Sequence, residues 1–345
     1  MNTIIIGKSI KENRPNIGDS SVNTYCSILN SLYRSLFKDG EFDVKNFNKT
    51  DEILEHIKDK NLASKKTILS ALFVLTEKPD YQKAMIDEAT EYNNLQKEQQ
   101  MTDKQKENWV TQDQIKAVFE KYKSTADYLV KEMKTRELTS KEFQTWQDFI
   151  LLSLSSGVFI EPQRVMDWVC FKVKNIDAKT DNYMTGKGNK CQLVFNAYKT
   201  AKYHGQKTMS CPPELCKILN TFINHVKKHS DHLLNDSNWK PLSQVTFTQR
   251  LNKIFGKNVS VNILRHSYLS QRFADGKISL KELSATAKNM GHSIEQSLEY
   301  VKLDAPKESK SDNIELTIEE KTDDENPAVE EPAKKRRGRP KKVIE

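Results

Sequence analysis

The sequence has no long hydrophobic run. Nothing in its 345 residues approaches the roughly 18 consecutive apolar residues of a membrane span. The opening stretch, MNTIIIGKSIKENRP, contains too short an apolar run for a secretory signal. We therefore expect an intracellular protein that is neither secreted nor inserted in a membrane.

Cysteine is scarce, and its spacing shows no pairing. The chain has five cysteines, and none form a CxxC pair: Cys26, Cys170, Cys191, Cys211 and Cys216. An odd, scattered set argues against a disulfide framework and against a cysteine-type zinc site. Free thiols in a reducing compartment are the expectation.

Patterns for metal ions and nucleotides are also weak. His225, His229 and His232 follow helical spacing, but no cysteine or carboxylate pairing supports a metal site, and a solvated helix end explains them better. The glycine-containing stretch GKGNK at 186–190 lacks the spacing of a phosphate-binding P-loop. We expect no metal and no cofactor.

The chain has a surplus of positive charge. Lysine and arginine number 55 against 47 acidic residues, which gives a net charge of +8 and a pI of about 9.0. The tail 305–345 holds 10 basic and 11 acidic residues, so the preceding part carries +9. This balance favours a polyanionic partner such as nucleic acid.

Periodicity and composition divide the chain into segments. Apolar residues at three- and four-residue steps predict helices at 21–37, 50–60 and 64–77. The expected organisation is an N-terminal extension 1–19, a helical domain 20–92, a polar linker 93–108, a second globular domain 109–304, a disordered acidic tail 305–333 and a basic segment 334–345.

The second domain reads as mainly helical with a small antiparallel sheet or hairpin. A new helix begins after Thr111, a suitable capping residue, and 146–159 forms an apolar core helix. Strand-like stretches at 189–200 and 205–213 flank a turn. Helices are again expected at 213–229, 245–255 and 261–273.

One of these helices contains an arginine that requires a partner. In VNILRHSYLS, residues 261–270, the apolar residues share a helix face, and Arg265 lies among them. A guanidinium is costly to bury unless an anion meets it. Three other segments offer companions: EPQRVMD with Arg164 and Asp167, a lysine-rich hairpin at 194–215, and KNMGHSIEQSLEY with His292 and Tyr300.

The order of these residues resembles the catalytic domain of the tyrosine recombinases, the phage-integrase family. In order, the chain supplies an arginine, a hairpin lysine, an arginine–histidine helix, a glycine–histidine pair and a tyrosine. The match covers about residues 110–304, and the helical segment before it corresponds to the family's core-binding domain. The resemblance implies a two-lobed clamp around double-stranded DNA and a homo-tetramer on two duplexes, working without metal or ATP.

The resemblance also implies the roles of the site residues. Tyr300 is the last tyrosine of the chain and would be the nucleophile that forms a 3′-phosphotyrosyl bond. Arg164, Arg265 and His292 would donate hydrogen bonds to the scissile phosphate, whose oxygens gain negative charge during attack. Asp167 would orient one of these donors from behind.

A lysine would protonate the leaving 5′ oxygen. In the family, the strand after this lysine leads into a helix that begins at a proline, which here is QKTMSCPP followed by PELCKIL. That alignment places the lysine in YKT, so we choose Lys199, with Lys202 and Lys187 as alternatives.

The sequence departs from the family pattern at two places. Asn262 stands where relatives often carry histidine, and an amide can donate to phosphate but cannot accept a proton. His266 directly follows Arg265, and successive positions on a helix point about 100° apart. We therefore interpret His266 as a structural residue that does not replace the missing histidine. Eight positions separate His292 from Tyr300, where nine are common.

The basic tail KKRRGRPKK resembles an AT-hook with the core Arg337, Gly338, Arg339 and Pro340. Arginines of such segments enter narrow A·T minor grooves. A nuclear localisation signal is the alternative interpretation. Either favours a eukaryotic host, at the nucleus or a cytoplasmic viral replication site.

The sequence thus predicts a site-specific recombinase that integrates or excises a viral or mobile genome. A type IB topoisomerase would share the chemistry but relax supercoils as a monomer. A catalytically inactive descendant would bind DNA without forming a covalent adduct.

Overall fold

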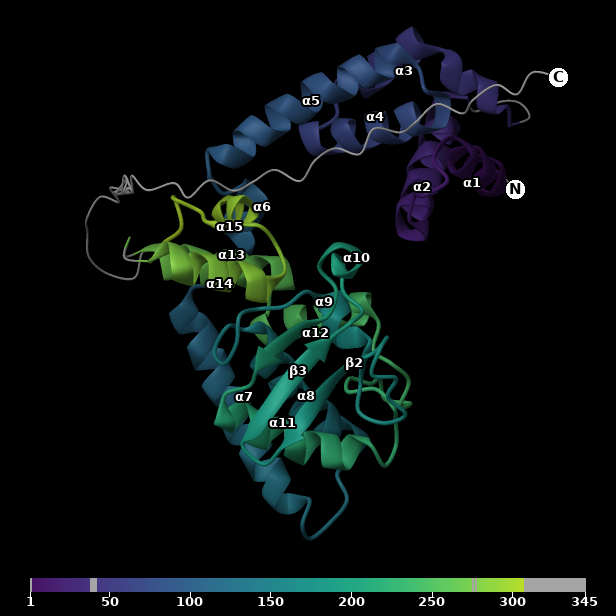
Figure 1. Ribbon diagram of the computed structural model, residues 1–345. Helices are drawn as coiled ribbons and strands as arrows, with labels where there is room; N and C mark the ends of the chain where they lie inside the picture. The colour runs from purple at the N-terminus through teal and green to yellow at the C-terminus, as the bar shows by residue number, and fades with distance from the viewer. Residues whose placement is uncertain (1, 38–41, 275, 277, 307–345) are drawn as a thin grey trace, which may run out of the picture. The chain divides into compact units, whose positions relative to one another are not determined.

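The computed structural model describes residues 2–37, 42–274, 276 and 278–306 (Figure 1). The predicted acidic tail 305–333 lies outside the described residues from 307 onward. The AT-hook-like residues Arg337, Gly338, Arg339 and Pro340 lie outside them as well.

The predicted fold class is confirmed: the described chain is mainly helical and carries one small sheet. The elements before residue 100 are α1 (Asn2–Asn13), α2 (Asp19–Leu36), η1 (Val44–Asn48), α3 (Thr50–Ile57), α4 (Leu62–Thr76) and α5 (Pro79–Lys97). Those after it are α6 (Asp103–Asn108), α7 (Gln112–Glu132), α8 (Ser140–Ser155), α9 (Val165–Val169), β1 (Phe171–Lys172), β2 (Asn182–Lys187), β3 (Lys190–Phe195), α10 (Ala201–His204), β4 (Lys207–Ser210), α11 (Pro213–Val226), α12 (Gln244–Phe255), α13 (Val261–Ala274), α14 (Leu280–Met290) and α15 (Ile294–Tyr300).

The first hydrophobic core joins α1 to α5. Helices α2, α3 and α4 appear where periodicity predicts them, but the interpretation of 1–19 as an extension needs correction. Ile6 and Ile10 of α1 are fully buried in the same core as Leu29 and Leu72. Only two of the residues of α1 are buried, so its periodicity is too weak to predict a helix.

The predicted linker 93–108 contains regular structure. Helix α5 continues to Lys97, and α6 follows with a capping box in which Thr102 and Gln105 exchange hydrogen bonds. The side chain of Asn108 accepts a hydrogen bond from the backbone N–H of Asn258. Polar composition predicted an inter-domain linker, and capping and tertiary hydrogen bonds give much of this segment regular structure.

The second hydrophobic core surrounds α8. Ten residues of this helix are buried, and Trp146 packs edge-on against Phe222 of α11. Thr111 caps α7 as predicted, and Thr139 caps α8 in the same way. This core extends to the start of α13, so the helix that carries Arg265 is anchored at its N-terminal end.

The sheet has the strand order β1-β2-β3-β4 and is mixed. The two predicted strands are β3 and β4, which pair antiparallel, with Phe195 opposite Lys207. The predicted turn between them contains the short helix α10. Strand β2 pairs antiparallel with β3 around Gly188, and β1 pairs with β2 in parallel, so the sheet is not purely antiparallel.

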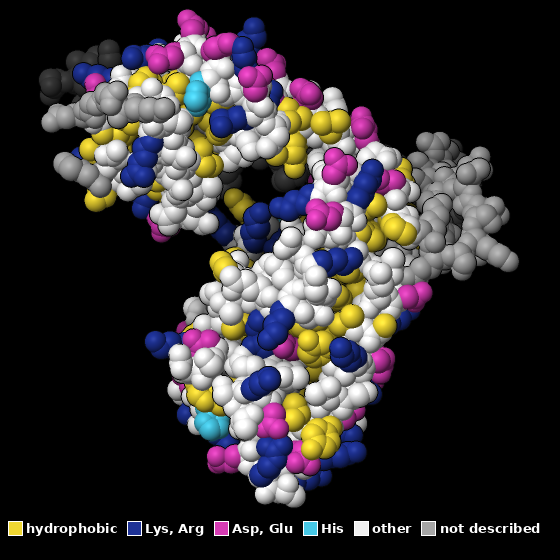
Figure 2. Space-filling view, turned by 180° about the vertical axis from the view of Figure 1, so that it is seen from behind, with side chains coloured by type: hydrophobic (Ala, Val, Ile, Leu, Met, Phe, Trp, Pro, Cys, Tyr) yellow, Lys and Arg dark blue, Asp and Glu magenta, His cyan; other side chains and the backbone are white. Residues whose placement is uncertain are grey.

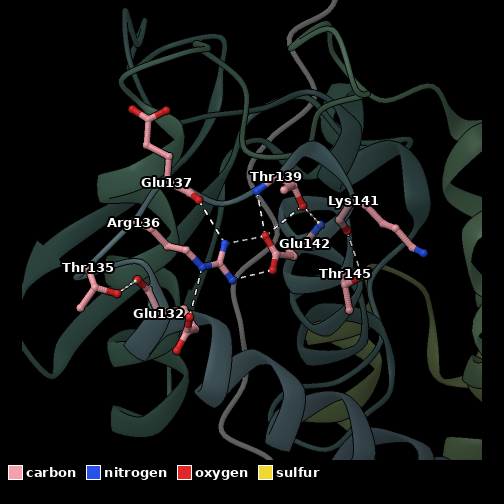
Figure 3. A network of polar contacts seen from close by, with 8 residues as sticks. All are labelled: Glu132, Thr135, Arg136, Glu137, Thr139, Lys141, Glu142 and Thr145. Carbon is pink, nitrogen blue, oxygen red and sulfur yellow. Dashed lines mark hydrogen bonds and ion pairs between the residues drawn. The ribbon is translucent and has the colours of Figure 1, made fainter.

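The turn between α7 and α8 is closed by an exposed ion-pair network (Figure 3). Arg136 donates from Nη1 and Nη2 to both carboxylate oxygens of Glu142, at 2.9 and 2.7 Å. Its Nε donates to Glu132 at 3.1 Å. Hydrogen bonds from Arg136, then from the backbone N–H and the hydroxyl of Thr139, hold the pKa of Glu142 down at about 2.

The surface carries charge of both signs. Figure 2 shows lysine and arginine side chains spread over one face with acidic side chains among them. Within the described residues, no helix combines the length and the apolar character needed to cross a membrane.

Candidate functional site

Arg164 and Gly291 meet where two loops approach each other. Arg164 is the N-cap residue of α9, and its Nη1 donates to the backbone carbonyl of Gly291 at 3.1 Å. Gly291 ends α14 in the left-handed conformation, with φ at +71°. A Cβ at this position would lie 3.3 Å from Nη1 of Arg164 and 3.8 Å from Nζ of Lys207. Glycine therefore permits the close approach of both cations.

Arg265 lies at the centre of the site and is fully buried. It donates from Nη1 to the carbonyl of Pro162 at 2.6 Å and from Nη2 to that of Met290 at 3.3 Å. Its Nε has no hydrogen-bond partner among the described residues, and no carboxylate of that set lies within ion-pair distance. Burial lowers the pKa of Arg265, and the site holds a cation whose charge is not neutralised by direct contact.

The lysine of the cluster is Lys207, the first residue of β4, and both arginines act on it through space. Its Nζ donates to the side chain of Gln163 at 2.7 Å and to the carbonyl of Asn289 at 3.4 Å. The ammonium also lies 4.6 Å from the centre of the Phe195 ring. Only 9% of Lys207 is exposed, and this burial lowers its pKa to about 8, helped by the repulsion of the arginines.

His292 begins the turn after α14 and is half-buried. The hydroxyl of Ser297 donates to the carbonyl of Ser293, and Nδ1 of His292 lies 3.1 Å from both oxygens. These partners place the imidazole proton on Nδ1, because a carbonyl can only accept. Nε2 is buried without a partner in the described chain. Burial and Arg265 lower the pKa of this imidazole to about 4, so Nε2 is unprotonated at neutral pH.

Tyr300 closes the cluster from the last turn of α15. Its ring lies over the Arg265 guanidinium at 4.9 Å and is nearly parallel to the ring of His292, with centroids 5.3 Å apart. His266 donates from Nδ1 to the backbone carbonyl of Tyr300 at 2.7 Å, and its other nitrogen faces Gln105 at 3.3 Å. Burial lowers the pKa of His266 to about 4, so it holds the tyrosine in place as a neutral structural residue.

Asp167 lies behind the cations. It is fully buried, and neither carboxylate oxygen has a hydrogen-bond partner in the described part of the chain. Burial raises its pKa, while Lys207 and Arg164 pull in the opposite direction. It is therefore an acidic group that acts on the cations through space.

The other predicted residues are not joined to this cluster by any contact of the described chain. Asn262 is exposed on the first turn of α13. Lys187 at the end of β2, Lys199 after β3 and Lys202 in α10 are exposed as well. The structure brings Lys207, and not Lys199, next to Gly291 and Gln163 of the cluster, and which lysine donates the proton stays a prediction. The alignment took QKTMSCPP, which contains β4, as the strand that follows the catalytic lysine, and it therefore placed that lysine earlier, in YKT. The buried lysine, Lys207, lies on β4 itself.

A cavity of about 450 Å³ opens beside the cluster. Lys207 and Thr208 of β4 line one side, and Asn289, His292 and Ser293 line the other. Polar side chains and the edge of Lys207 therefore reach solvent at this point.

The histidines of α11 contact aromatic side chains. His229 stacks on Trp239 at 4.2 Å, and His225 packs against Trp146 at 5.5 Å. In the described ranges, no group of three or more histidine, cysteine, aspartate or glutamate residues is arranged to hold a metal ion.

Two residues of the site escaped sequence analysis, Lys207 and Gln163. A signal for Lys207 was present in the alternation of β4, where Lys207 and Met209 share the buried face. A lysine at an inward position of a strand indicates a buried partner. Gln163 has no such pattern, because it lies in an irregular loop before α9.

Comparisons with known proteins add little at the level of sequence. No family model matches the chain, and no curated protein is significantly similar to it. Among solved structures, the XerH site-specific recombinase bound to its difH substrate in a pre-cleavage complex is similar. The likeness covers 87% of this chain and 82% of that chain, with a TM-score of 0.48 and 14% sequence identity.

Proposed function

We propose that the protein cleaves and rejoins DNA strands at specific sites through a 3′-phosphotyrosyl intermediate, as a tyrosine recombinase. The observation that carries the proposal is the convergence of Arg164, Arg265, Lys207, His292 and Tyr300. A buried guanidinium that meets two carbonyl oxygens and the Tyr300 side chain, and no carboxylate among the described residues, is suited to receive an anion from outside the chain. In the proposed complex, that anion is a DNA phosphodiester bound beside the ring of Tyr300.

In the proposed reaction, Tyr300 is the nucleophile and Lys207 is the proton donor. The hydroxyl oxygen of Tyr300 attacks phosphorus, the bond from phosphorus to the 5′ oxygen breaks, and Lys207 gives its proton to that oxygen. The products are a 3′-phosphotyrosine and a free 5′ hydroxyl. Attack by a 5′ hydroxyl of a second strand reverses the steps and joins the new partner.

The two arginines and His292 would act on the charge that develops. Arg164 and Arg265 donate to the non-bridging oxygens, and they are held in position before DNA arrives. The unprotonated Nε2 of His292 has no partner among the described residues, and its ring is next to that of Tyr300, so we assign it the proton of Tyr300, since Asn262 cannot serve as a base. The resulting imidazolium can then donate to the phosphate.

The same proposal covers the finer expectations from the sequence. We propose double-stranded DNA as the partner, a homo-tetramer on two duplexes during strand exchange, and integration or excision of a viral or mobile genome. The AT-hook-like residues 337–340 would add affinity for A·T-rich minor grooves. Their contribution is measurable as the loss of non-specific DNA affinity on removing residues 305–345.

Covalent trapping tests the central claim. The protein is mixed with supercoiled DNA that carries the ends of its genetic element, and the mixture is quenched with SDS. We expect a protein–DNA adduct that Tyr300→Phe abolishes and that Tyr203→Phe keeps, because Tyr203 is exposed outside the cluster. An adduct that survives in Tyr300→Phe would place the nucleophile elsewhere. Tight DNA binding without any adduct would favour an inactive, DNA-binding descendant.

A further inference from the structure

The side chain of Gln163 has a defined orientation in the site. Gln163 is fully buried and lies directly before Arg164. Its Oε1 accepts from Nζ of Lys207 at 2.7 Å, and its Nε2 donates to the carbonyl of Glu161 at 2.6 Å. An ammonium cannot accept and a carbonyl cannot donate, so these two partners fix which end of the amide faces Lys207.

The contacts around Gln163 close into a ring. Asn289 donates from its side chain to the carboxylate of Glu161 at 3.2 Å, and its backbone carbonyl lies 3.4 Å from Nζ of Lys207. The loop before α9 and the end of α14 are thus linked through one ammonium group. Lys207 is held by neutral oxygens, and the carboxylates of Glu161 and Asp167 act on it only through space.

We propose that Gln163 is the positioning residue of the proton donor: it orients Lys207 toward the leaving 5′ oxygen while leaving its charge unpaired. The inference rests on the proposed strand-cleavage function. A carboxylate in the same place would hold the proton more tightly and make Lys207 a weaker acid. An apolar side chain would leave one ammonium hydrogen without its partner in a buried place.

The two substitutions are expected to act in opposite directions on the protonation of Lys207. Gln163→Glu places a negative charge in contact with the ammonium and raises the pKa of Lys207 above its present value of about 8. Gln163→Leu removes an acceptor from a buried cation and lowers that pKa further. A residue that only fills space would change neither.

The test compares two DNA substrates in single-turnover cleavage. One has the natural 5′ oxygen at the scissile bond, and the other has sulfur there, which leaves as a thiolate and does not require a proton donor. The ratio of the two rates isolates the proton transfer from phosphate binding and from folding. Its dependence on pH reports the pKa of the donor.

We expect Gln163→Leu to cleave the oxygen substrate roughly 10-fold more slowly, a fraction of the 10²–10⁴-fold that a positioned proton donor contributes. On the sulfur substrate it should match the unmodified protein. The fall of the rate ratio at high pH should move to lower pH in Gln163→Leu and to higher pH in Gln163→Glu. Gln147→Leu is the matched control, because Gln147 is an equally buried glutamine bonded to Asn235 outside the cluster.

The outcomes separate this inference from the proposed function. If the unmodified protein cleaves neither substrate, the proposed function itself is wrong. If it cleaves both but Gln163→Leu slows them equally with no pH shift, Gln163 is only a structural residue. Gln147→Leu should lower the melting temperature and leave the rate ratio unchanged.

Discussion

Arg136 and Arg265 are each the centre of a polar network, and the two networks are opposite in kind. Arg136 lies on the surface and binds two carboxylates, Glu132 and Glu142, that its own neighbourhood supplies (Figure 3). Arg265 is fully buried and contacts the carbonyls of Pro162 and Met290 and the side chain of Tyr300. Among the described residues, buried Arg265 has no carboxylate within ion-pair distance, whereas exposed Arg136 has two.

This difference in partners separates cations that stabilise the fold from cations that are available to bind a ligand. Exposed ion pairs are screened by water and contribute little, so a chain can form or lose them cheaply. An unpaired buried charge is costly, and a fold retains it where it serves another purpose. Lys207 and Arg164 lie in the same cluster as Arg265, and their hydrogen bonds go to Gln163 and to the carbonyl of Gly291. Neither has a carboxylate within ion-pair distance among the described residues, so the energetic cost of an unpaired charge applies to them too.

Replacing Lys207 should have the largest effect among substitutions of the cations. Lys207→Ala removes the proposed proton donor, and we expect cleavage to fall by about 10²–10⁴-fold. Lys199→Ala, which removes an exposed lysine nearby, should leave the rate within a few-fold of the unmodified protein. Single-turnover cleavage of one oligonucleotide substrate measures both. The opposite ranking would restore Lys199 and break the argument from burial.

Arg265→Lys tests whether the buried arginine serves phosphate. The ammonium of lysine cannot form the two parallel hydrogen bonds of a guanidinium, so we expect cleavage to slow by roughly 10²–10³-fold. Arg136→Lys is its counterpart in the surface network and should cleave at the normal rate. Equal losses in both variants would indicate a general effect on folding, which circular dichroism would reveal.

Gly291→Ala should crowd the site from the backbone. The substitution imposes a Cβ on a residue with φ at +71° and places it 3.3 Å from Arg164. We expect a loss of about 1 kcal/mol or more in urea unfolding, with slower cleavage. Gly256→Ala shares the strain, with φ at +68°, but its Cβ meets nothing within 4 Å. It should lose stability and keep its activity, and a slow Gly256→Ala would refute the crowding explanation.

The smallest effect is expected in the surface network. The pKa of Glu142 is about 2 in the folded protein, below its ordinary value of 4.5, so its contribution is present above pH 4.5 and lost as the pH falls through 2. Glu142→Gln should therefore lower the melting temperature slightly at pH 7 and not at pH 2. Cleavage should be unchanged. A melting difference that persists at pH 2 would show that charge is not its cause.

Much of the fold could be predicted from the sequence. Helices α2, α8 and α13 follow from apolar spacing, and Thr111 marks the start of α7 through its capping box. Helix α1 was missed because it presents only Ile6 and Ile10 to the core. The parallel pairing of β1 with β2 involves two residue pairs, too few to leave a pattern in the sequence.

The sequence by itself determined the kinds of residue and their order: two arginines, a glycine–histidine pair and a final tyrosine, with Arg265 on a helix that its apolar spacing predicts. Only the tertiary structure decided which lysine joins them, because burial depends on what covers a side chain and not on its neighbours in the chain. Lys207 and Gln163 are 44 residues apart. Their contact exists because β4 and the loop before α9 meet in the folded protein, where a largely buried ammonium needs oxygen partners from the chain.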